Sequence, residues 1–440
     1  MFYQNKLNEA LEKNGHPIRV GLIGAGQMGS GLVSQIEQIE GLEISAIADI
    51  ATDKAVSAFL NAGVDEKTII TNEKKINLIQ DQIESKKRIV TQHAQLIPEI
   101  PNIDVIVEAT GVPEIGAEIC HKALLEGKHV VNMNVESDVV VGYYLNRIAK
   151  ASGLIYTLIS GDEPGSIKEL FDFGSILGFD IVCVGKGKNN ILDVTATPDS
   201  VKQLAKTKKM NPKMLASFVD GTKTMAELTS IANGIGYPPD KRGAHGPEVL
   251  VKDLSKTFIP KEFGGILNNK YVVDFAVGND VAPGVFIIVT SDHPVILDDM
   301  RYLNNKHGFG NFWSIYRPYH LCNLEAPISI LRAVFNHEAT LATYKKPVAE
   351  LISIAKRDLN EGELIDQIGG YTVYGTIENA ETAHEEGFVP LGLIEGARVK
   401  KKIIKGNPIH FSDISINTQQ SIFHLRMLQD KMLGLKCPVQ

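Results

Sequence analysis

Residues 18–49 constrain the fold of this chain more than any other stretch. In order, they contain an apolar run (18–23), three glycines spaced as G-x-G-x-x-G (Gly24, Gly26 and Gly29), a helical pattern (30–40), a second apolar run (42–48) and Asp49. The acid comes twenty residues after the last glycine. A strand, a glycine turn, a helix and a strand that ends on an acid together make the dinucleotide-binding fingerprint, so we expect a βαβ unit that binds a nicotinamide cofactor.

Each position of the fingerprint has its own physical role. The first glycine allows a tight turn, the second lets the backbone approach a pyrophosphate, and the third lets helix and strand pack closely. The helix that begins near Gln27 and Met28 offers free N–H groups to the phosphates. Asp49 is expected to accept a hydrogen bond from the ribose 2′-OH, which favours NAD over NADP. Lys54 follows too far along the helix to settle that choice, so both cofactor forms stay open.

The composition excludes several other classes of protein. The chain has 440 residues, enough for two or three domains, and a net charge of −7 without a large basic block, so no nucleic acid partner is expected. The four cysteines (Cys120, Cys183, Cys322 and Cys437) are far apart, which argues against disulfides and a zinc site and fits a reducing cytoplasm. No apolar run is long enough to cross a membrane, and residues 1–17 lack a signal-peptide core.

The rest of the first 160 residues continues the same alternation. Strands are expected at 103–111, 129–134 and 154–159, with helices between them at 113–127 and 138–153, and the charged segment 64–98 is expected to add a strand and a helix to the sheet. This pattern is typical of an α/β, Rossmann-type, doubly wound parallel sheet.

Ligands of such a sheet lie beyond the carboxyl ends of its strands. Besides the glycine loop, these ends carry Thr110 and Gly111, then Asn132, Asn134 and Glu136. We expect Asn134 to bond the nicotinamide carboxamide and Glu136 to meet the substrate, although an ordinary approach to a helix would look the same.

Three segments are expected along the chain. Residues 1–160 form the NAD(P)-binding domain with a leader helix at its start, and residues 161–345, with less regular alternation, form an α+β catalytic or oligomerisation domain. Residues 346–440 are rich in glycine and aromatic residues, as in a small β fold, and include a basic strand at 398–405 and a C-terminal helix at 412–429. We expect the chain to form a homo-oligomer.

Two short motifs beyond the sheet carry candidate chemistry. In Gly185-Lys186-Gly187-Lys188, which follows an apolar strand, two lysines two residues apart point to the same side and suit a phosphate or a proton transfer. A solvated Lys-Gly turn is the alternative. Asp162 and Glu163, at the end of another strand, offer paired carboxylates that suit a divalent cation or an acid or base. A turn with a capping acid before a helix is the alternative there.

A third motif, residues 316–325, places Arg317 and His320 in an apolar frame. An arginine there can clamp a phosphate or carboxylate with two hydrogen bonds, and a histidine can exchange a proton near neutral pH. A tyrosine- and proline-rich loop held by its own hydrogen bonds is the alternative.

These motifs together resemble a known family. The fingerprint, VNMNVESDV (131–139), SGDEPG (160–165), GKGKNN (185–190) and YRPYHLCNLE (316–325) look like the homoserine-dehydrogenase-related oxidoreductases with a C-terminal SAF domain. That group includes the 1-deoxy-D-xylulose 5-phosphate reductoisomerase-like enzymes. Residues 355–375 resemble the opening of a SAF domain, and the likeness spans nearly the whole chain.

The resemblance implies an NAD(P)H-dependent oxidoreductase that reduces the carbonyl of a small phosphorylated sugar, with or without a preceding isomerisation, as in isoprenoid biosynthesis. It implies NADPH, which conflicts with Asp49, and a divalent metal such as Mg²⁺ or Mn²⁺. Asp162 and Glu163 are then the metal ligands, although their order departs from the Asp-x-Glu of the ordinary reductoisomerase. Lys186, Lys188, Arg317 and His320 bind phosphate or polarise the carbonyl. The alternatives are a homoserine dehydrogenase and a non-catalytic NAD(H)-binding redox sensor.

Overall fold

The computed structural model describes residues 2–436 and divides into two compact units. Unit 1 comprises residues 1–162 and 321–342, and unit 2 comprises residues 163–320 and 343–440. Each unit is built from two separate stretches of the chain. The sequence-based division at residues 160 and 345 into three domains stays a prediction.

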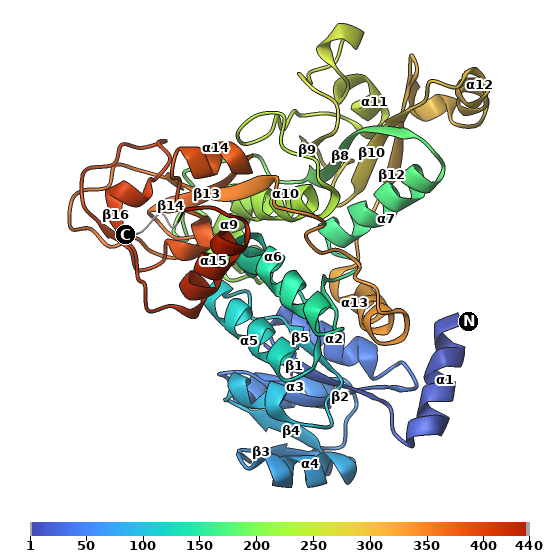
Figure 1. Ribbon diagram of the computed structural model, residues 1–440, viewed down its shortest axis with the longest axis vertical. Helices are drawn as coiled ribbons and strands as arrows, with labels where there is room; N and C mark the ends of the chain where they lie inside the picture. Colours follow the sequence, from blue (N-terminus) through green and yellow to red (C-terminus); the bar gives the residue numbers. More distant parts are fainter. Residues whose placement is uncertain (1, 437–440) are drawn as a thin grey trace. The chain divides into compact units, whose positions relative to one another are not determined.

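Unit 1 is organised around one sheet of seven parallel strands in the order β3-β4-β2-β1-β5-β6-β7 (Figure 1). The strands are β1 (Ile18–Ile23), β2 (Leu42–Ala48), β3 (Ile69–Thr71), β4 (Arg88–Thr91), β5 (Val105–Glu108), β6 (His129–Asn132) and β7 (Tyr156–Leu158). The central strands are buried along their whole length, since helices cover both faces of a parallel sheet.

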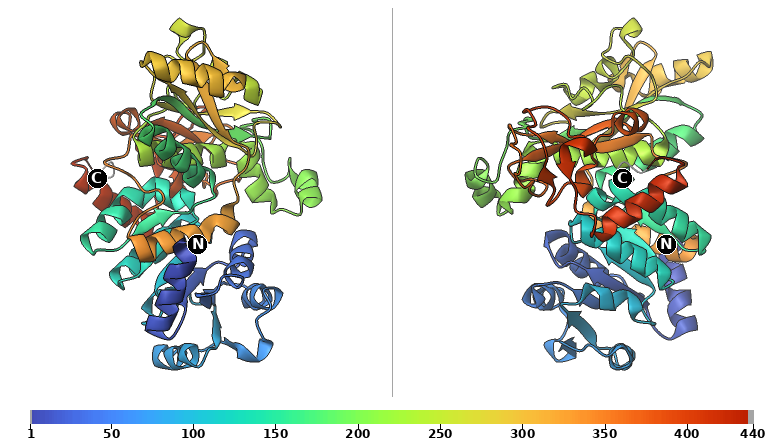
Figure 2. Two further views of the ribbon diagram at one scale, coloured as in Figure 1. Left: turned by 90° about the vertical axis from the view of Figure 1, so that its right-hand side faces the viewer. Right: turned by 60° about the vertical axis from the view of Figure 1, so that its left-hand side comes forward.

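Helices connect these strands in two directions from the centre of the sheet. The connecting helices are α2 (Gln27–Ile36), α3 (Thr52–Asn61), α4 (Ile76–Glu84), α5 (Pro113–Leu125) and α6 (Val135–Ala151), while α1 (Phe2–Asn14) precedes β1 and α13 (Cys322–Leu331) comes from the second stretch. Because parallel crossovers are right-handed, the helices that lead outward from β1 and from β5 cover opposite faces (Figure 1 and Figure 2). The order of strands reverses between β1 and β5, which is where such sheets bind ligands.

The predicted fold class is confirmed in this unit, and most elements lie where they are expected. The charged segment 64–98 adds a helix, α4, to this unit as predicted, and two strands of the sheet, β3 and β4, where one was expected. The helix expected at 138–153 begins earlier, at Val135, because Asn134 caps it: the Asn134 carboxamide oxygen accepts the Ser137 N–H at 3.1 Å.

Unit 2 contains a mixed sheet in the order β11-β12-β10-β8-β9. Its strands are β8 (Asp180–Lys188), β9 (Val272–Val277), β10 (Val285–Thr290), β11 (Gly308–Phe309) and β12 (Phe312–Arg317). The helices are α7 (Glu163–Ile176), α8 (Lys202–Lys208), α9 (Pro212–Val219), α10 (Thr222–Ile235), α11 (Leu254–Thr257) and α12 (Pro294–Leu303). Helix α7 packs on β8 and β10, and α10 packs on α7 and β9 (Figure 1).

The last stretch of unit 2 is built on a hairpin. It comprises β13 (Ala349–Ala355), which pairs antiparallel with β14 (Val373–Asn379), α14 (Ala380–Glu385), the short pair β15 (Arg398–Val399) and β16 (Ile414–Ser415), and α15 (Ser421–Met432). The prediction of a basic strand over 398–405 is wrong beyond Val399, since the strand ends there and only Ile403 pairs further on, in an isolated bridge with Leu359. The helix predicted at 412–429 begins later, at Ser421.

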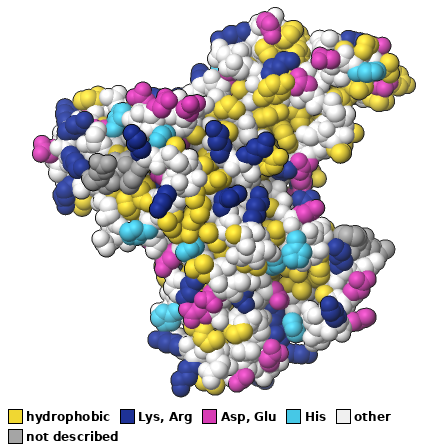
Figure 3. All heavy atoms as spheres, viewed as in Figure 1, with side chains coloured by type: hydrophobic (Ala, Val, Ile, Leu, Met, Phe, Trp, Pro, Cys, Tyr) yellow, Lys and Arg dark blue, Asp and Glu magenta, His cyan; other side chains and the backbone are white. Residues whose placement is uncertain are grey.

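The surface of the described residues gives few strong signals. Three large hydrophobic side chains of α12 are exposed, Val295, Tyr302 and Leu303, in the region where Figure 3 shows hydrophobic atoms at the upper right. No helix between residues 2 and 436 has the length and apolar character that a membrane crossing needs. The described cysteines, Cys120, Cys183 and Cys322, are free thiols, and Cys437 lies outside the described residues.

Candidate functional site

The glycine loop of unit 1 has the geometry that the fingerprint requires. Gly24 has a φ of +98°, and a Cβ added there would lie 2.7 Å from the carbonyl oxygen of Ala109. A Cβ at Gly29 would collide with the carbonyl oxygen of Gly24, so this glycine lets α2 approach the loop. A Cβ at Gly26 would meet nothing within 4 Å. The space over Gly26 is therefore open, as a pyrophosphate at the start of α2 requires.

Asp49 has a second task that the sequence did not reveal. Its carboxylate accepts the N–H of Ala25 at 2.7 Å with one oxygen and the N–H of Ala51 at 2.8 Å with the other. The acid at the end of β2 therefore ties the glycine loop to the start of the next segment. A bond to a ribose hydroxyl must use the remaining lone pairs of these oxygens.

A cavity of about 370 Å³ lies between the start of α2 and one face of α3. Its lining includes Gly26 and Gln27 of the loop and Asp53, Lys54 and Ser57 of α3. Lys54 thus stands beside the glycine loop, although its position in the sequence suggested a place too far along the helix. The Lys54 ammonium can form an ion pair with the 2′-phosphate of NADP, whereas the Asp53 carboxylate repels that phosphate.

Glu108 lies at the point where the strand order of the sheet reverses. It pairs with Ile23 of β1 on one side and with Asn132 of β6 on the other, and its side chain is completely buried. One carboxylate oxygen accepts the Thr110 N–H at 2.9 Å, and the other is buried without a hydrogen bond. Burial raises the pKa of Glu108 to about 7, against hydrogen bonds that lower it. The acid holds the Thr110-Gly111 turn in place.

The two asparagines after β6 support the loop and do not face an open space. The Asn132 side chain donates to the Tyr156 hydroxyl at 2.9 Å, and Asn134 donates to the Val112 carbonyl at 3.0 Å. Both residues are almost completely buried. Asn134 thus caps α6, and its expected bond to the nicotinamide carboxamide stays a prediction. Glu136 is partly exposed in the first turn of α6 and keeps its predicted place near the substrate as a prediction.

In unit 2, the two lysines of the Gly-Lys motif lie on β8 itself and not in the predicted turn. The strand runs through Lys188, so its alternation places both lysines on the face covered by α7 and α10. The glycine before each lysine admits neighbouring backbone: a Cβ at Gly185 would lie 2.7 Å from the carbonyl oxygen of Asp274 in β9.

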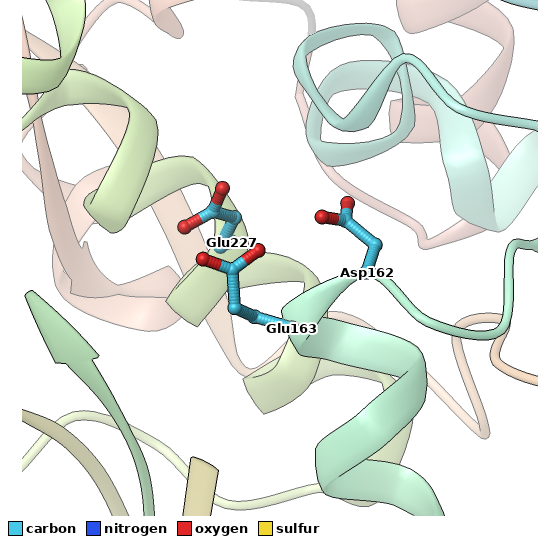
Figure 4. A group of neighbouring side chains, drawn as sticks. All are labelled: Asp162, Glu163 and Glu227. Carbon is cyan, nitrogen blue, oxygen red and sulfur yellow. The ribbon is translucent and has the colours of Figure 1, made fainter. Parts of the chain in front are cut away.

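Lys186 joins two buried glutamates. Its ammonium donates to Glu163, the first residue of α7, at 2.6 Å and also to Glu227 in the middle of α10. Figure 4 shows the side chains of Glu163 and Glu227 directed toward each other. Burial lowers the pKa of Lys186, but the charges of Glu163 and Glu227 outweigh it and hold that pKa above its usual value. The lysine is therefore a permanent cation between two carboxylates.

Lys188 is the lysine with an uncommitted charge. Its ammonium donates to the carbonyl oxygen of Phe218 at 2.5 Å and, among the described residues, makes no ion pair with a carboxylate. Burial, followed by the charge of Lys186, lowers the pKa of Lys188 to about 8. A lysine with such a pKa can hold an anion and give up a proton near neutral pH.

His320 and Arg317 lie near this cluster but are engaged differently. His320 Nδ1 contacts the Pro283 carbonyl oxygen at 2.7 Å, and its Nε2 is 3.6 Å from Glu163. Arg317 forms an ion pair with Glu169 at 3.0 Å and lies over the ring of Tyr319. Its guanidinium is thus partly committed, so His320 is the better placed of the two for the Lys186 cluster.

The structure brings together Glu163, Lys186, Lys188 and His320, and adds Glu227, which the sequence reasoning missed. No motif surrounds Glu227. Glu227 is the single acid of α10, and nothing in that helix sets it apart in the sequence. Asp162 is the last residue of unit 1 and precedes Glu163 directly.

Two known domains match this chain. Residues 24–156 match the NAD-binding domain of homoserine dehydrogenase, and residues 161–326 match the catalytic domain described as oxidoreductase DRL. An NAD-binding domain with the glycine loop described above is thus followed by an oxidoreductase catalytic domain. The protein is an NAD(P)-dependent oxidoreductase. The matches leave the SAF-like character of residues 346–440 a prediction.

Solved structures with a similar fold include a probable dehydrogenase from Thermotoga maritima, at 15% identity and a TM-score of 0.40, covering 73% of this chain and 90% of that one. Scyllo-inositol dehydrogenase from Lactobacillus casei, solved with NAD(H) and scyllo-inositol, is 15% identical at a TM-score of 0.36 and covers 62% and 73%. These likenesses are too distant to carry an argument about the substrate of this oxidoreductase. No curated protein matches the chain.

Proposed function

We propose that this oxidoreductase transfers a hydride from NAD(P)H to the carbonyl carbon of a small phosphorylated sugar, in a reaction like that of 1-deoxy-D-xylulose 5-phosphate reductoisomerase. The observation that carries the proposal is the buried pair of lysines on β8, one fixed between two glutamates and one with an uncommitted charge. The match to the catalytic domain of oxidoreductase DRL covers these residues and supports an oxidoreductase reaction at this site.

Each group has a distinct part in the proposed reduction. Hydride addition to a carbonyl leaves an alkoxide, which must receive a proton. Lys188 supplies that proton, since its pKa of about 8 lets it give up a proton near neutral pH. Lys186 keeps its proton and contributes a fixed positive charge that polarises the carbonyl. His320 and Arg317 bind the phosphate of the substrate.

A divalent cation is part of the proposal. The carboxylate oxygens of Glu163 and Glu227 lie within 4.8 Å of one another, and oxygen donors of this kind suit Mg²⁺ or Mn²⁺. Lys186 balances only one of their two negative charges. Glu163 and Glu227 would hold the ion, with Asp162 as the further predicted ligand, and a bound ion would act as a Lewis acid on the carbonyl and any neighbouring hydroxyl. Dialysis against EDTA should then lower kcat, and added Mg²⁺ or Mn²⁺ should restore it.

The form of the cofactor also belongs to the proposal. The domain match supports NAD(H), and Lys54 beside the cavity at the glycine loop supports acceptance of a 2′-phosphate as well. We propose that both NADH and NADPH bind. The variant Lys54→Met should weaken NADPH at least 10-fold more than NADH, which equilibrium titration of cofactor fluorescence measures directly.

Oxidation of homoserine is the second candidate, because the NAD-binding domain matches that of homoserine dehydrogenase. One experiment separates the two. Purified protein is offered 1-deoxy-D-xylulose 5-phosphate, other phosphorylated sugars and homoserine with each cofactor, and absorbance at 340 nm is followed. Turnover of a phosphorylated sugar supports the proposal, and turnover of homoserine alone overturns it.

A further inference from the structure

The stretch 343–440 makes direct contacts with the part of unit 2 that carries the lysine cluster. Lys356, which follows β13, is 4% exposed, and its ammonium forms an ion pair with Asp220 at 2.8 Å. The same ammonium donates to the carbonyl oxygens of Ala196 at 2.6 Å and Gly370 at 2.8 Å. A buried lysine with three such partners fixes every group that it touches.

The connection 218–221 comprises the last two residues of α9 and the two residues that link it to α10, and it contains Asp220. The other carboxylate oxygen of Asp220 accepts the N–H of Thr222, the first residue of α10, at 2.8 Å. Two residues before it, the carbonyl oxygen of Phe218 accepts the hydrogen bond from Lys188. The connection 218–221 is therefore held by Lys356 on one side and by the proposed proton donor on the other.

Helix α10 is also attached at both of its ends. At its start, the Thr222 hydroxyl accepts the N–H of Gly375 in β14 at 2.9 Å. Near its end, the Asn233 carboxamide oxygen accepts the N–H groups of Val348 and Ala349 at 2.8 and 3.0 Å. Glu227, the partner of Lys186, lies between these two attachments, and Figure 1 shows α10 beside β13.

We infer that residues 348–375 of this stretch are a positioning part of the catalytic machinery, which acts by holding α10 and the connection 218–221 against Lys186 and Lys188. Lys356 is the central positioning residue, because it fixes the start of α10 and the carbonyl partner of Lys188 through one carboxylate. The inference rests on the proposed function of the two lysines. It does not depend on which sugar is the substrate.

The first test is the reactivity of the Lys188 amine in full-length Lys356→Met. Without Lys356, the connection 218–221 is released and Lys188 loses its buried carbonyl partner. Both proteins are labelled briefly with acetic anhydride, and the peptide that contains Lys188 is analysed by mass spectrometry. Lys188 should be acetylated at least 5-fold faster in Lys356→Met than in the chain without the substitution. The partly exposed Lys270 serves as the internal reference in every sample.

A matched control separates this role from a general loss of stability. Arg426 is another buried cation of the same stretch, and its ion pairs with Glu350 and Asp430 both lie within residues 343–440. Arg426→Met should leave Lys188 labelling and kcat within 2-fold of the unmodified values. Lys356→Met should lower kcat at least 10-fold while the Kd for NADH, measured by fluorescence, changes less than 2-fold.

Equal labelling of Lys188 in Lys356→Met and in the chain without the substitution overturns the inference. An equal effect of Lys356→Met and Arg426→Met on Lys188 labelling and kcat overturns it as well. If Lys356→Met does not fold, Thr222→Val replaces it, since this change removes only the hydroxyl that accepts the Gly375 N–H. The labelling result holds even if no phosphorylated sugar is turned over. Failure of the proposed substrate class is thus distinguishable from failure of the positioning role.

Discussion

Replacement of Gly26 by valine should abolish cofactor binding and leave the fold of unit 1 intact. Gly26 precedes α2 with a φ of −67°, which any residue adopts, and a Cβ there meets no atom within 4 Å. The cost to the free energy of unfolding should therefore stay within about 1 kcal/mol. The valine side chain fills the space over the loop that a pyrophosphate needs. Loss of two charge-assisted hydrogen bonds, at about 1.5–3 kcal/mol each, weakens binding by at least about 100-fold.

Thermal unfolding with and without cofactor measures this effect. At 100 times its Kd, NADH stabilises the unmodified protein by about 2.7 kcal/mol, which for a unit of this size raises Tm by roughly 5–10 °C. The same NADH concentration should stabilise Gly26→Val by no more than about 0.4 kcal/mol, because a 100-fold weaker Kd equals that concentration. Gly29→Val is the contrast, because its Cβ would collide with the carbonyl oxygen of Gly24 and should lower Tm without cofactor. A normal NADH-induced shift in Gly26→Val would refute the placement of the pyrophosphate.

Three further predictions follow from the buried charges. Lys188→Met should lower kcat/KM for a phosphorylated sugar at least about 100-fold, with the Kd for NADH nearly unchanged. In the enzyme without this substitution, kcat/KM should fall above about pH 8, where Lys188 loses the proton that it donates. Unchanged kinetics in the variant would remove Lys188 from the site. The pKa of Glu108 rises from 4.5 to about 7 on folding, so the folded state binds the extra proton and its stability falls by roughly 3 kcal/mol as pH rises through that window. Urea unfolding at pH 5 and pH 8 should show this fall in the unmodified chain and not in Glu108→Gln, and parallel curves would contradict it. Lys186→Met should cost about 3–5 kcal/mol of unfolding free energy, because it removes the cation that lies between two buried carboxylates. Lys270→Met, at a pair with Asp180 that is about one-third exposed, should cost less than about 1 kcal/mol. Similar losses in the two variants would show that the buried cluster is hydrated.

The sequence predicts the first unit well because its signals are local. The glycine spacing, the apolar strands and the acid after β2 all lie within thirty-two residues, and each has one structural meaning in that order. Even there the side-chain partner of Asp49 was not predictable, since it depends on how the loop turns back toward Ala25. A carboxylate at a strand end serves a ribose or a backbone amide equally well.

The second unit resisted prediction because its site depends on long-range pairing. Glu227 meets Lys186 across 41 residues, and no pattern in α10 separates that acid from an ordinary surface glutamate. Gly185 and Gly187 resemble turn residues, but in β8 they admit neighbouring backbone and side chains, so the strand continues to Lys188. Glycine has both uses, and only the neighbouring strands decide between them.

The return of residues 321–342 to unit 1 affects how the chain is made. Helix α13 packs against α2, where a Cβ at Gly31 would meet the side chain of Asn323. The nucleotide-binding unit therefore lacks one of its helices until the ribosome has passed residue 342. Neither unit can be expressed as a single uninterrupted fragment, so any attempt to exchange the cofactor-binding half with that of another enzyme must graft two pieces at once.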